Sequence, residues 1–226
     1  EKIKNGIIKN YIAYINYIII VIIKFFIMIN LYCRTKSNIN DFNFLKNSKI
    51  TLKVKGIGIK NIFGKDGGCS FDNQYYPDEI YINNNKTDNT TYSYNFDQEN
   101  NTVELIWNNP ITSCREMFRK CFDIIEIDVS NFDSSQVVDM TTMFGYLHGL
   151  TSVNLTNFDK SNVKDMGFIF YECFLLTSSN LSIFETSKVT RMTEIFKGCI
   201  NLKYINLESF IENELLISDN MFKEVP

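Results

Sequence analysis

Few side chains of this sequence could carry out catalysis. The chain has 226 residues and a single histidine, His148. A serine or cysteine nucleophile is activated by a neighbouring base such as histidine, so His148 would have to serve in any such site. It lies in a 26-residue repeat whose later copies have Phe174 and Ile200 at the same position. This replacement indicates a turn residue without a catalytic role, and we expect no enzyme activity.

Metal and phosphate sites are not predicted either. Cys114 and Cys121 lie seven residues apart with one histidine to join them, which is not the spacing of a zinc site. The glycines within residues 56–68 form neither G-x-x-x-x-G-K-[ST] nor G-x-G-x-x-G. Carboxylates such as Glu126 and Asp128 could suggest glycosidase chemistry, but no pocket is implied and a solvated charged surface is the better interpretation. The sequence therefore predicts no metal and no cofactor.

Composition favours a folded chain without a nucleic-acid partner. Hydrophobic residues make up 45% of the sequence and aromatic residues 14%, which is enough for a buried core. The formal net charge is -3. Nucleic-acid-binding surfaces carry concentrated positive charge, so this balance argues against such a function.

The C-terminal half is a tandem repeat with a step of 26 residues. This step connects the phenylalanines Phe118, Phe144, Phe170, Phe196 and Phe222. The same step relates Phe132, Phe158, Phe184 and Phe210, and also Val137, Val163, Val189 and Leu215. A fixed period of 20–50 residues is the signature of stacked repeats, each too small to bury a core alone.

Each repeat is expected to contain a strand followed by a short helix. The alternating stretches 126–129, 152–155, 178–181 and 204–207 predict strands that stack in parallel. In the second copy, one face of a helix is predicted by the spacing i, i+3, i+6, i+7 and i+10 of Val137, Met140, Met143, Phe144 and Leu147. Ser135 precedes this stretch and could cap it.

The outward positions of the predicted strands form the candidate partner surface. They are Glu126, Asp128, Ser152, Asn154, Ser178, Asn180, Tyr204 and Asn206. The asparagines could stack as a ladder that adds stability. We predict that Tyr204→Ala weakens binding of a partner without unfolding the protein, and an unchanged affinity would contradict this.

Cys173 and Cys199 occupy one column in adjacent repeats. Strands lie about 4.8 Å apart, and a disulfide needs Cα atoms roughly 4.4–6.8 Å apart, so a bond between the two is allowed. The alternative is a ladder of buried free thiols, because free cysteine is among the most buried residue types.

Two segments precede the repeats. Residues 1–40 have a basic start and an apolar stretch at 11–33, which is long enough to span a membrane but contains Lys24. The stretch could be a membrane-spanning helix, a cleaved signal peptide or a mistranslation of A/T-rich DNA. Residues 41–110 contain alternating stretches such as 50–54, which predict a small antiparallel β cap.

The repeats resemble a known family over residues 111–226. Residues 131–144 (NFDSSQVVDMTTMF) and 155–166 (LTNFDKSNVKDM) resemble the repeat of BspA-like leucine-rich-repeat surface proteins, which also occurs in mycoplasma-type lipoproteins and protist surface proteins. The column of Cys121, Cys173 and Cys199 matches the family's usual cysteine, whereas the family pattern is broken by Leu147, Ile169 and Ile195. The resemblance implies a cell-surface or secreted protein, with adhesion and host-interaction roles in some members. It does not imply an enzyme. It supplies no ligand.

We therefore expect an α/β repeat solenoid of leucine-rich-repeat type over residues 111–226, preceded by a β cap and an N-terminal apolar helix. The predicted function is a surface-displayed interaction or adhesion module, from a fragment of a protist surface protein, with an unknown protein or glycan partner. The alternatives are a structural spacer, or a cytoplasmic repeat scaffold if segment 11–33 is an artefact. The sequence stops part-way through a repeat, so we expect further repeats or pairing of ends in the intact protein.

Overall fold

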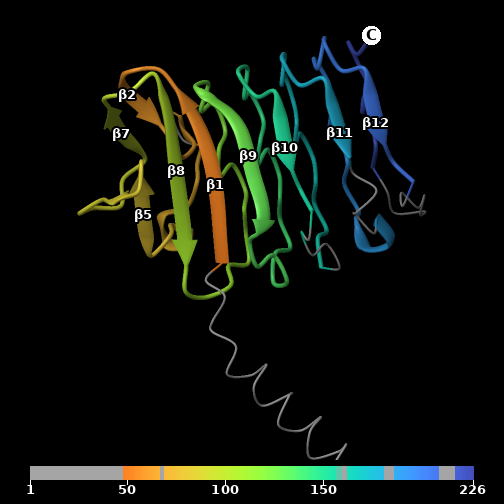
Figure 1. Ribbon diagram of the computed structural model, residues 1–226. Coiled ribbons are helices and arrows are strands. Elements are labelled where there is room, and N and C mark those ends of the chain that lie inside the picture. Colours follow the sequence, from red (N-terminus) through yellow and green to blue (C-terminus); the bar gives the residue numbers. More distant parts are fainter. Residues whose placement is uncertain (1–47, 67–68, 157, 159–161, 181–185, 209–216) are drawn as a thin grey trace, which may run out of the picture. The chain divides into compact units, whose positions relative to one another are not determined.

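A computed structural model describes residues 48–66, 69–156, 158, 162–180, 186–208 and 217–226 (Figure 1). Contacts divide the chain into two compact units, Glu1–Lys46 and Asn47–Pro226, and the described residues all belong to the second. The apolar stretch 11–33 lies outside them. Among the described residues, no helix is long and apolar enough to cross a membrane.

The described residues are mostly β. The strands are β1 (Ser48–Lys55), β2 (Gly58–Asn61), β3 (Lys65–Asp66), β4 (Cys69–Ser70), β5 (Glu79–Ile82), β6 (Asn85–Lys86), β7 (Ser93–Phe96), β8 (Asn100–Trp107), β9 (Ile124–Asn131), β10 (Ser152–Asn154), β11 (Ser178–Asn180) and β12 (Tyr204–Asn206). Two short 3-10 helices accompany them, η1 (Asn73–Tyr75) and η2 (Thr186–Lys188). The stretches that alternation predicted as strands all overlap one of these strands, so that part of the prediction is confirmed.

The largest sheet joins the N-terminal strands to the repeats. Its order is β10-β9-β1-β8-β5-β6. β1 pairs antiparallel with β8 on one side and with β9 on the other, and β9 pairs in parallel with β10. Figure 1 shows these strands side by side, followed by β11 and β12, which pair in parallel as a separate sheet. β9 is therefore the strand at which an antiparallel arrangement changes to a parallel one.

Successive repeats are joined by a regular hydrogen-bond pattern. Single parallel bridges connect Ser113, Asp139, Asp165, Arg191 and Ile217 one after another. In the first step, four N–H groups donate to carbonyls of the next repeat at 2.9–3.1 Å, those of Cys114, Glu116, Phe118 and Lys120. The same four positions donate in the next three steps. Backbone groups that a helix would satisfy internally are thus satisfied between repeats.

The predicted fold class, an α/β solenoid with a helix in each coil, is wrong. The described residues contain no α-helix, and their strands form mixed sheets in which β9 and β10 belong to the same sheet as the N-terminal strands. The stretch that follows Val137 is a series of turns. Thr142 and Tyr146 have φ angles of 57° and 61°, in the left-handed region that ends a right-handed helix.

The error has a physical cause in the turns. The N–H of Met140 donates to the carbonyl of Asp165 in the next repeat rather than to a carbonyl four residues earlier. Ser135, the expected helix cap, lies in a turn where Asp133 Oδ1 accepts its N–H at 3.1 Å. Consecutive turns place apolar side chains on the inner side at intervals of three and four residues. A helix produces the same spacing, so the pattern does not distinguish the two.

The core continues from the N-terminal strands into the repeats. The rings of Phe118, Phe144, Phe170, Phe196 and Phe222 stack in one column. Phe63 extends this column at its start, 6.4 Å from the centroid of Phe118. Beside it, the N–H of Gly64 donates to Met117 O at 2.9 Å. A Cβ at Gly64 would lie 2.2 Å from Glu116 O, so only glycine allows this close approach.

Candidate functional site

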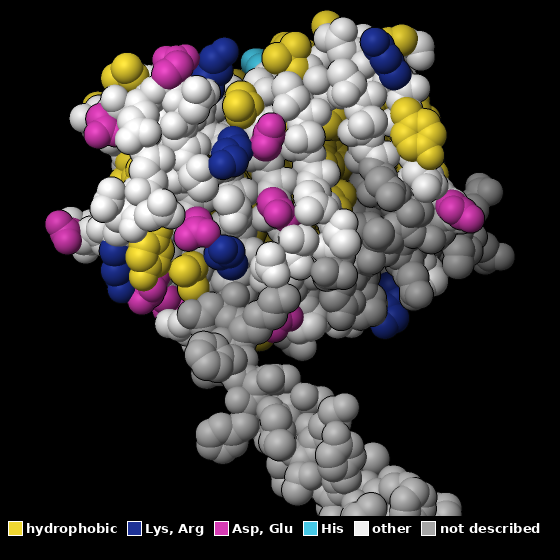
Figure 2. All heavy atoms as spheres, viewed as in Figure 1, with side chains coloured by type: hydrophobic (Ala, Val, Ile, Leu, Met, Phe, Trp, Pro, Cys, Tyr) yellow, Lys and Arg dark blue, Asp and Glu magenta, His cyan; other side chains and the backbone are white. Residues whose placement is uncertain are grey.

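The first candidate surface is the outward side of β8, β1, β9 and β10, here called the strand face. Cross-strand register places polar side chains in two rows that run across these strands. One row is Thr102, Lys53, Glu126 and Ser152, and the next is Glu104, Thr51, Asp128 and Asn154. Neighbouring positions in a row are separated by the strand spacing of about 4.8 Å. Figure 2 shows charged and uncoloured side chains over the middle of this face.

The structure divides the eight predicted partner residues into two groups of four. Glu126 and Asp128 on β9 lie in register with Ser152 and Asn154 on β10. The second group belongs to β11 and β12, where Ser178 pairs with Tyr204 and Asn180 with Asn206. Tyr204 is 61% exposed, as an outward position requires.

Two adjoining hollows mark the strand face. The first has a volume of about 340 Å³ and is lined by Lys53, Val54, Asn100, Asn101, Thr102, Ile125 and Glu126. The second, of about 310 Å³, is lined by Thr51, Lys53, Glu126, Ile127, Asp128, Ser152, Val153 and Asn154. Lys53 and Glu126 line both hollows. We call the two together the polar trough.

Several polar groups of the trough are already used by the chain. Lys53 Nζ donates to Thr102 Oγ1 at 2.8 Å, and Asp128 Oδ1 accepts the N–H of Ser130 at 2.9 Å. Asn154 Oδ1 accepts a backbone N–H two residues ahead at 3.1 Å, and Asn206 Oδ1 does the same at 3.0 Å. These are local Asx turns, so the two asparagine oxygens serve the turn after their own strands.

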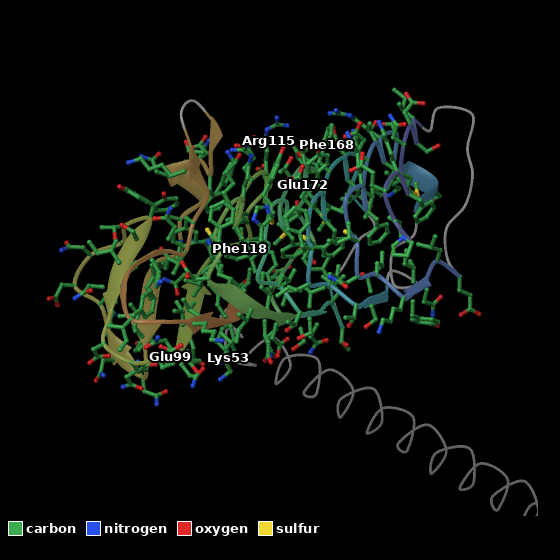
Figure 3. The ribbon with its side chains drawn as sticks, turned by 90° about the horizontal axis from the view of Figure 1, so that it is seen from above. Lys53, Glu99, Arg115, Phe118, Phe168 and Glu172 are labelled. Carbon is green, nitrogen blue, oxygen red and sulfur yellow. The ribbon has the colours of Figure 1, made fainter. Side chains whose placement is uncertain are left out.

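The opposite side of the molecule consists of the turns. Figure 3 places Arg115, Phe168 and Glu172 on this side, with Lys53 and Glu99 on the other and Phe118 between them. Its charges pair across repeats, with an N–O distance of 3.6 Å from Arg115 to Asp139. Arg191 also pairs across repeats, with Asp165 at 3.4 Å, whereas Lys197 pairs with Glu194 of its own repeat at 3.0 Å. A side whose charges satisfy one another presents little for a charged ligand.

The second candidate surface is an exposed apolar column that the sequence reasoning missed. We call the side chains of Phe122, His148, Phe174, Leu175 and Ile200 the apolar rim. The ring of His148 stacks between Phe122 at 4.8 Å and Phe174 at 4.3 Å. Phe122 is 49% exposed, Leu175 48% and Ile200 55%. The 26-residue step relates these positions in the sequence. The sequence did not show, however, whether their side chains point outward or into the core.

A hollow of about 520 Å³ adjoins the rim. Its apolar lining comes from Phe122, Ile125 and Leu175, and its polar lining includes Lys55 and Lys60. In Figure 2 the histidine and several hydrophobic side chains lie along the upper edge of the view, with charged side chains among them. Large exposed apolar side chains therefore distinguish the rim from the strand face.

His148 lies in this rim between two phenylalanine rings. Its Nε2 is buried and has no hydrogen-bond partner among the described residues, and Glu172 Oε2 lies 3.8 Å away. The neighbours of the ring are Phe122 and Phe174, which offer no nucleophile. Within the described ranges, no group of three His, Cys, Asp or Glu side chains could hold a metal ion.

The cysteines of the repeat column are buried free thiols in this structure. Cys173 Sγ donates to Phe144 O at 3.1 Å and Cys199 Sγ to Phe170 O at 3.0 Å. Burial raises the pKa of Cys199 to about 12, and burial with the nearby Cys199 raises the pKa of Cys173 well above its ordinary value. A thiol is reactive as its thiolate, so neither side chain is a nucleophile at neutral pH.

Comparison with known proteins identifies the family. The model described as "Mycoplasma protein of unknown function, DUF285" matches residues 88–210, which is more than half of the 226 residues. The chain belongs to this family. No curated protein and no solved structure matches the chain. The DUF285 match covers β8, β9 and β10 and so includes most of the polar trough, together with the entire apolar rim.

Proposed function

We propose that this DUF285 chain is a non-enzymatic interaction module, displayed on a cell surface, that binds a protein partner through the apolar rim. The proposal includes descent from the BspA-like surface proteins that the repeat motifs resemble. The observation that carries it is the line of half-exposed Phe122, Leu175 and Ile200. Contiguous exposed apolar side chains bordered by polar ones are typical of protein-interaction sites.

The shape of the rim supports a protein partner. Fully buried anchor side chains in pockets supply most of the energy of a protein interface. The 520 Å³ hollow between Phe122 and Leu175 can accept one such apolar anchor. Because both faces of the His148 ring, and one face each of Phe122 and Phe174, are occupied within the stack, the ring edges remain for contact, and edges suit aliphatic or aromatic side chains.

A structural spacer is the second candidate function. The four inter-repeat hydrogen bonds that recur at each step would let such repeats extend without a change in geometry. A spacer needs no partner, so its outward side chains can be exchanged without consequence. The two functions therefore differ in the effect of substitutions on the rim.

Binding is tested on an array of purified extracellular proteins, probed with the labelled protein. Wild type should bind at least one of them, and Leu175→Asp should weaken that binding at least tenfold, because a charge in an apolar contact is left without a partner. Val138→Asp is the matched control, since Val138 is also an exposed apolar residue (41%) but lies outside the rim. Equal binding by all three proteins would contradict binding through the rim, and binding by none would favour the spacer.

Display is tested separately with a tag placed after Pro226. A protease added to intact cells should remove the tag. Protection on intact cells, with cleavage only after permeabilisation, would contradict surface display.

A further inference from the structure

We infer that the polar trough on the strand face binds an extended, neutral β-1,4-linked glycan that lies across β8, β1, β9 and β10. This inference rests on the proposed function as a binding module but uses a different surface from the apolar rim. Three observations carry it. They are the types of side chain that line the two hollows, the side chains among them that have no hydrogen-bond partner among the described residues, and the spacing of the cross-strand rows.

The trough has the wrong composition for a protein partner. Cores of protein interfaces are enriched in aromatic residues, Met and Arg, and depleted in Lys, Glu, Asp and Ser. No aromatic, Met or Arg side chain is among the residues that line the two hollows. The lining instead combines Lys53, Glu126, Asp128 and Ser152, with Thr and Asn, and the aliphatic residues Val54, Ile125, Ile127 and Val153. Ammonium, carboxylate, hydroxyl and amide groups together suit a ligand made mainly of hydroxyl groups.

Glu126 is the group that most needs a ligand. It lies directly opposite Lys53 across β1 and β9, an arrangement that allows an ion pair. Lys53 Nζ turns instead to Thr102 Oγ1, and neither carboxylate oxygen of Glu126 has a hydrogen-bond or ion-pair partner among the described residues. The carboxylate can therefore accept two hydroxyl hydrogens, and such charge-assisted bonds are stronger than neutral ones. The side-chain hydroxyls of Thr51 and Ser152 likewise have no hydrogen-bond partner among the described residues, and they belong to the same two rows.

The spacing of the rows favours a linear chain over a single sugar. Lys53, Glu126 and Ser152 come from three adjacent strands, so they repeat at about 4.8 Å. One sugar of an extended β-1,4-linked chain is nearly as long as this step, so that successive sugars meet successive strands. An α-1,4-linked chain curls and cannot keep this match. Carboxylates in the trough also disfavour acidic polysaccharides.

The test uses calorimetric titration of the full chain with hexasaccharides of matched length. Wild type should bind cellohexaose or chitohexaose, and maltohexaose at least tenfold more weakly. Glu126→Gln should weaken binding about tenfold, the loss expected for a charge-assisted hydrogen bond. Ser152→Trp should abolish binding by filling the second hollow. Glu208→Gln, a carboxylate exchange at an exposed site outside the trough, should bind as wild type does.

Three outcomes would overturn the inference. They are no binding of either β-linked hexasaccharide, equal binding of maltohexaose, and full binding by both Glu126→Gln and Ser152→Trp. The comparison of Leu175→Asp with Val138→Asp on immobilised proteins is measured independently. A failure of the glycan inference is therefore distinguishable from a failure of the proposed protein-binding function.

Discussion

Two columns of stacked rings run through the same repeats, one buried and one exposed. In the buried column, which contains Phe118, Phe144, Phe170, Phe196 and Phe222, ring centroids are 5.3–6.1 Å apart with interplanar angles of 6–17°. In the rim, Phe122, His148 and Phe174 stack at 4.3–4.8 Å. The shared step of 26 residues produces both columns. Stacking therefore reports the repeat, and burial decides whether a column stabilises the fold or remains available to a partner.

The largest expected effect is at the centre of the buried column. Phe144 is fully buried and contacts rings on both sides. Phe144→Ala should lower the free energy of unfolding by about 3–5 kcal/mol, through lost burial and a remaining cavity. Phe174→Ala in the rim should cost about 1 kcal/mol, the value of an aromatic contact beyond its area. Denaturant unfolding of both variants measures the difference. Similar losses of stability would contradict the view that burial separates the two columns.

The buried thiol of Cys199 should make the free energy of unfolding depend on pH. The folded pKa of Cys199, about 12, lies above the unfolded value of about 8.5. A raised folded pKa means that the stabilisation is complete below about pH 8.5 and is lost as pH rises towards 12. Between pH 7.5 and 10, Cys199→Ala should therefore lose roughly 2 kcal/mol less stability than wild type. Unfolding curves at the two pH values measure this. Parallel losses would show that Cys199 titrates alike in both states.

The last ring of the buried column should fall between the two extremes. Phe222 stacks on Phe196 at 5.9 Å and is 45% exposed. Phe222→Ala should cost about 1–2 kcal/mol, since about half of the burial of a phenylalanine is lost. Thermal and denaturant unfolding of Phe222→Ala and Phe144→Ala give the ratio of their losses of stability. A loss as large as that of Phe144→Ala would show that exposure does not set the contribution of a ring.

The repeat period and the alternation of apolar residues predicted the core positions and the strands. They did not predict the path of the backbone between the strands or the pairing of distant strands. The 26-residue register placed the core column of Phe118 correctly, and alternation found β1 and β9. Turns with left-handed residues such as Thr142 reproduce the apolar spacing of a helix, so the helices were predicted wrongly. The pairing of β1 with β9 brings Thr51 and Glu126, which are 75 positions apart in the sequence, into one trough. No local sequence pattern encodes such a contact.

The smallest effect is expected at His148, where the two columns are compared most directly. Phe122 and Phe174 occupy the same column and are already phenylalanines. His148→Phe should keep the stack and remove a buried Nε2 that lacks a hydrogen-bond partner among the described residues, while it loses the weak interaction with Glu172 at 3.8 Å. Both terms are small and of opposite sign, because a contact of this length at the surface contributes at most about 1 kcal/mol and an unsatisfied polar atom costs a similar amount. We expect a change within about 0.5 kcal/mol in the free energy of unfolding. A loss above about 2 kcal/mol would mean that His148 holds the fold together through its nitrogen atoms, and the rim would then be a structural column like the buried one.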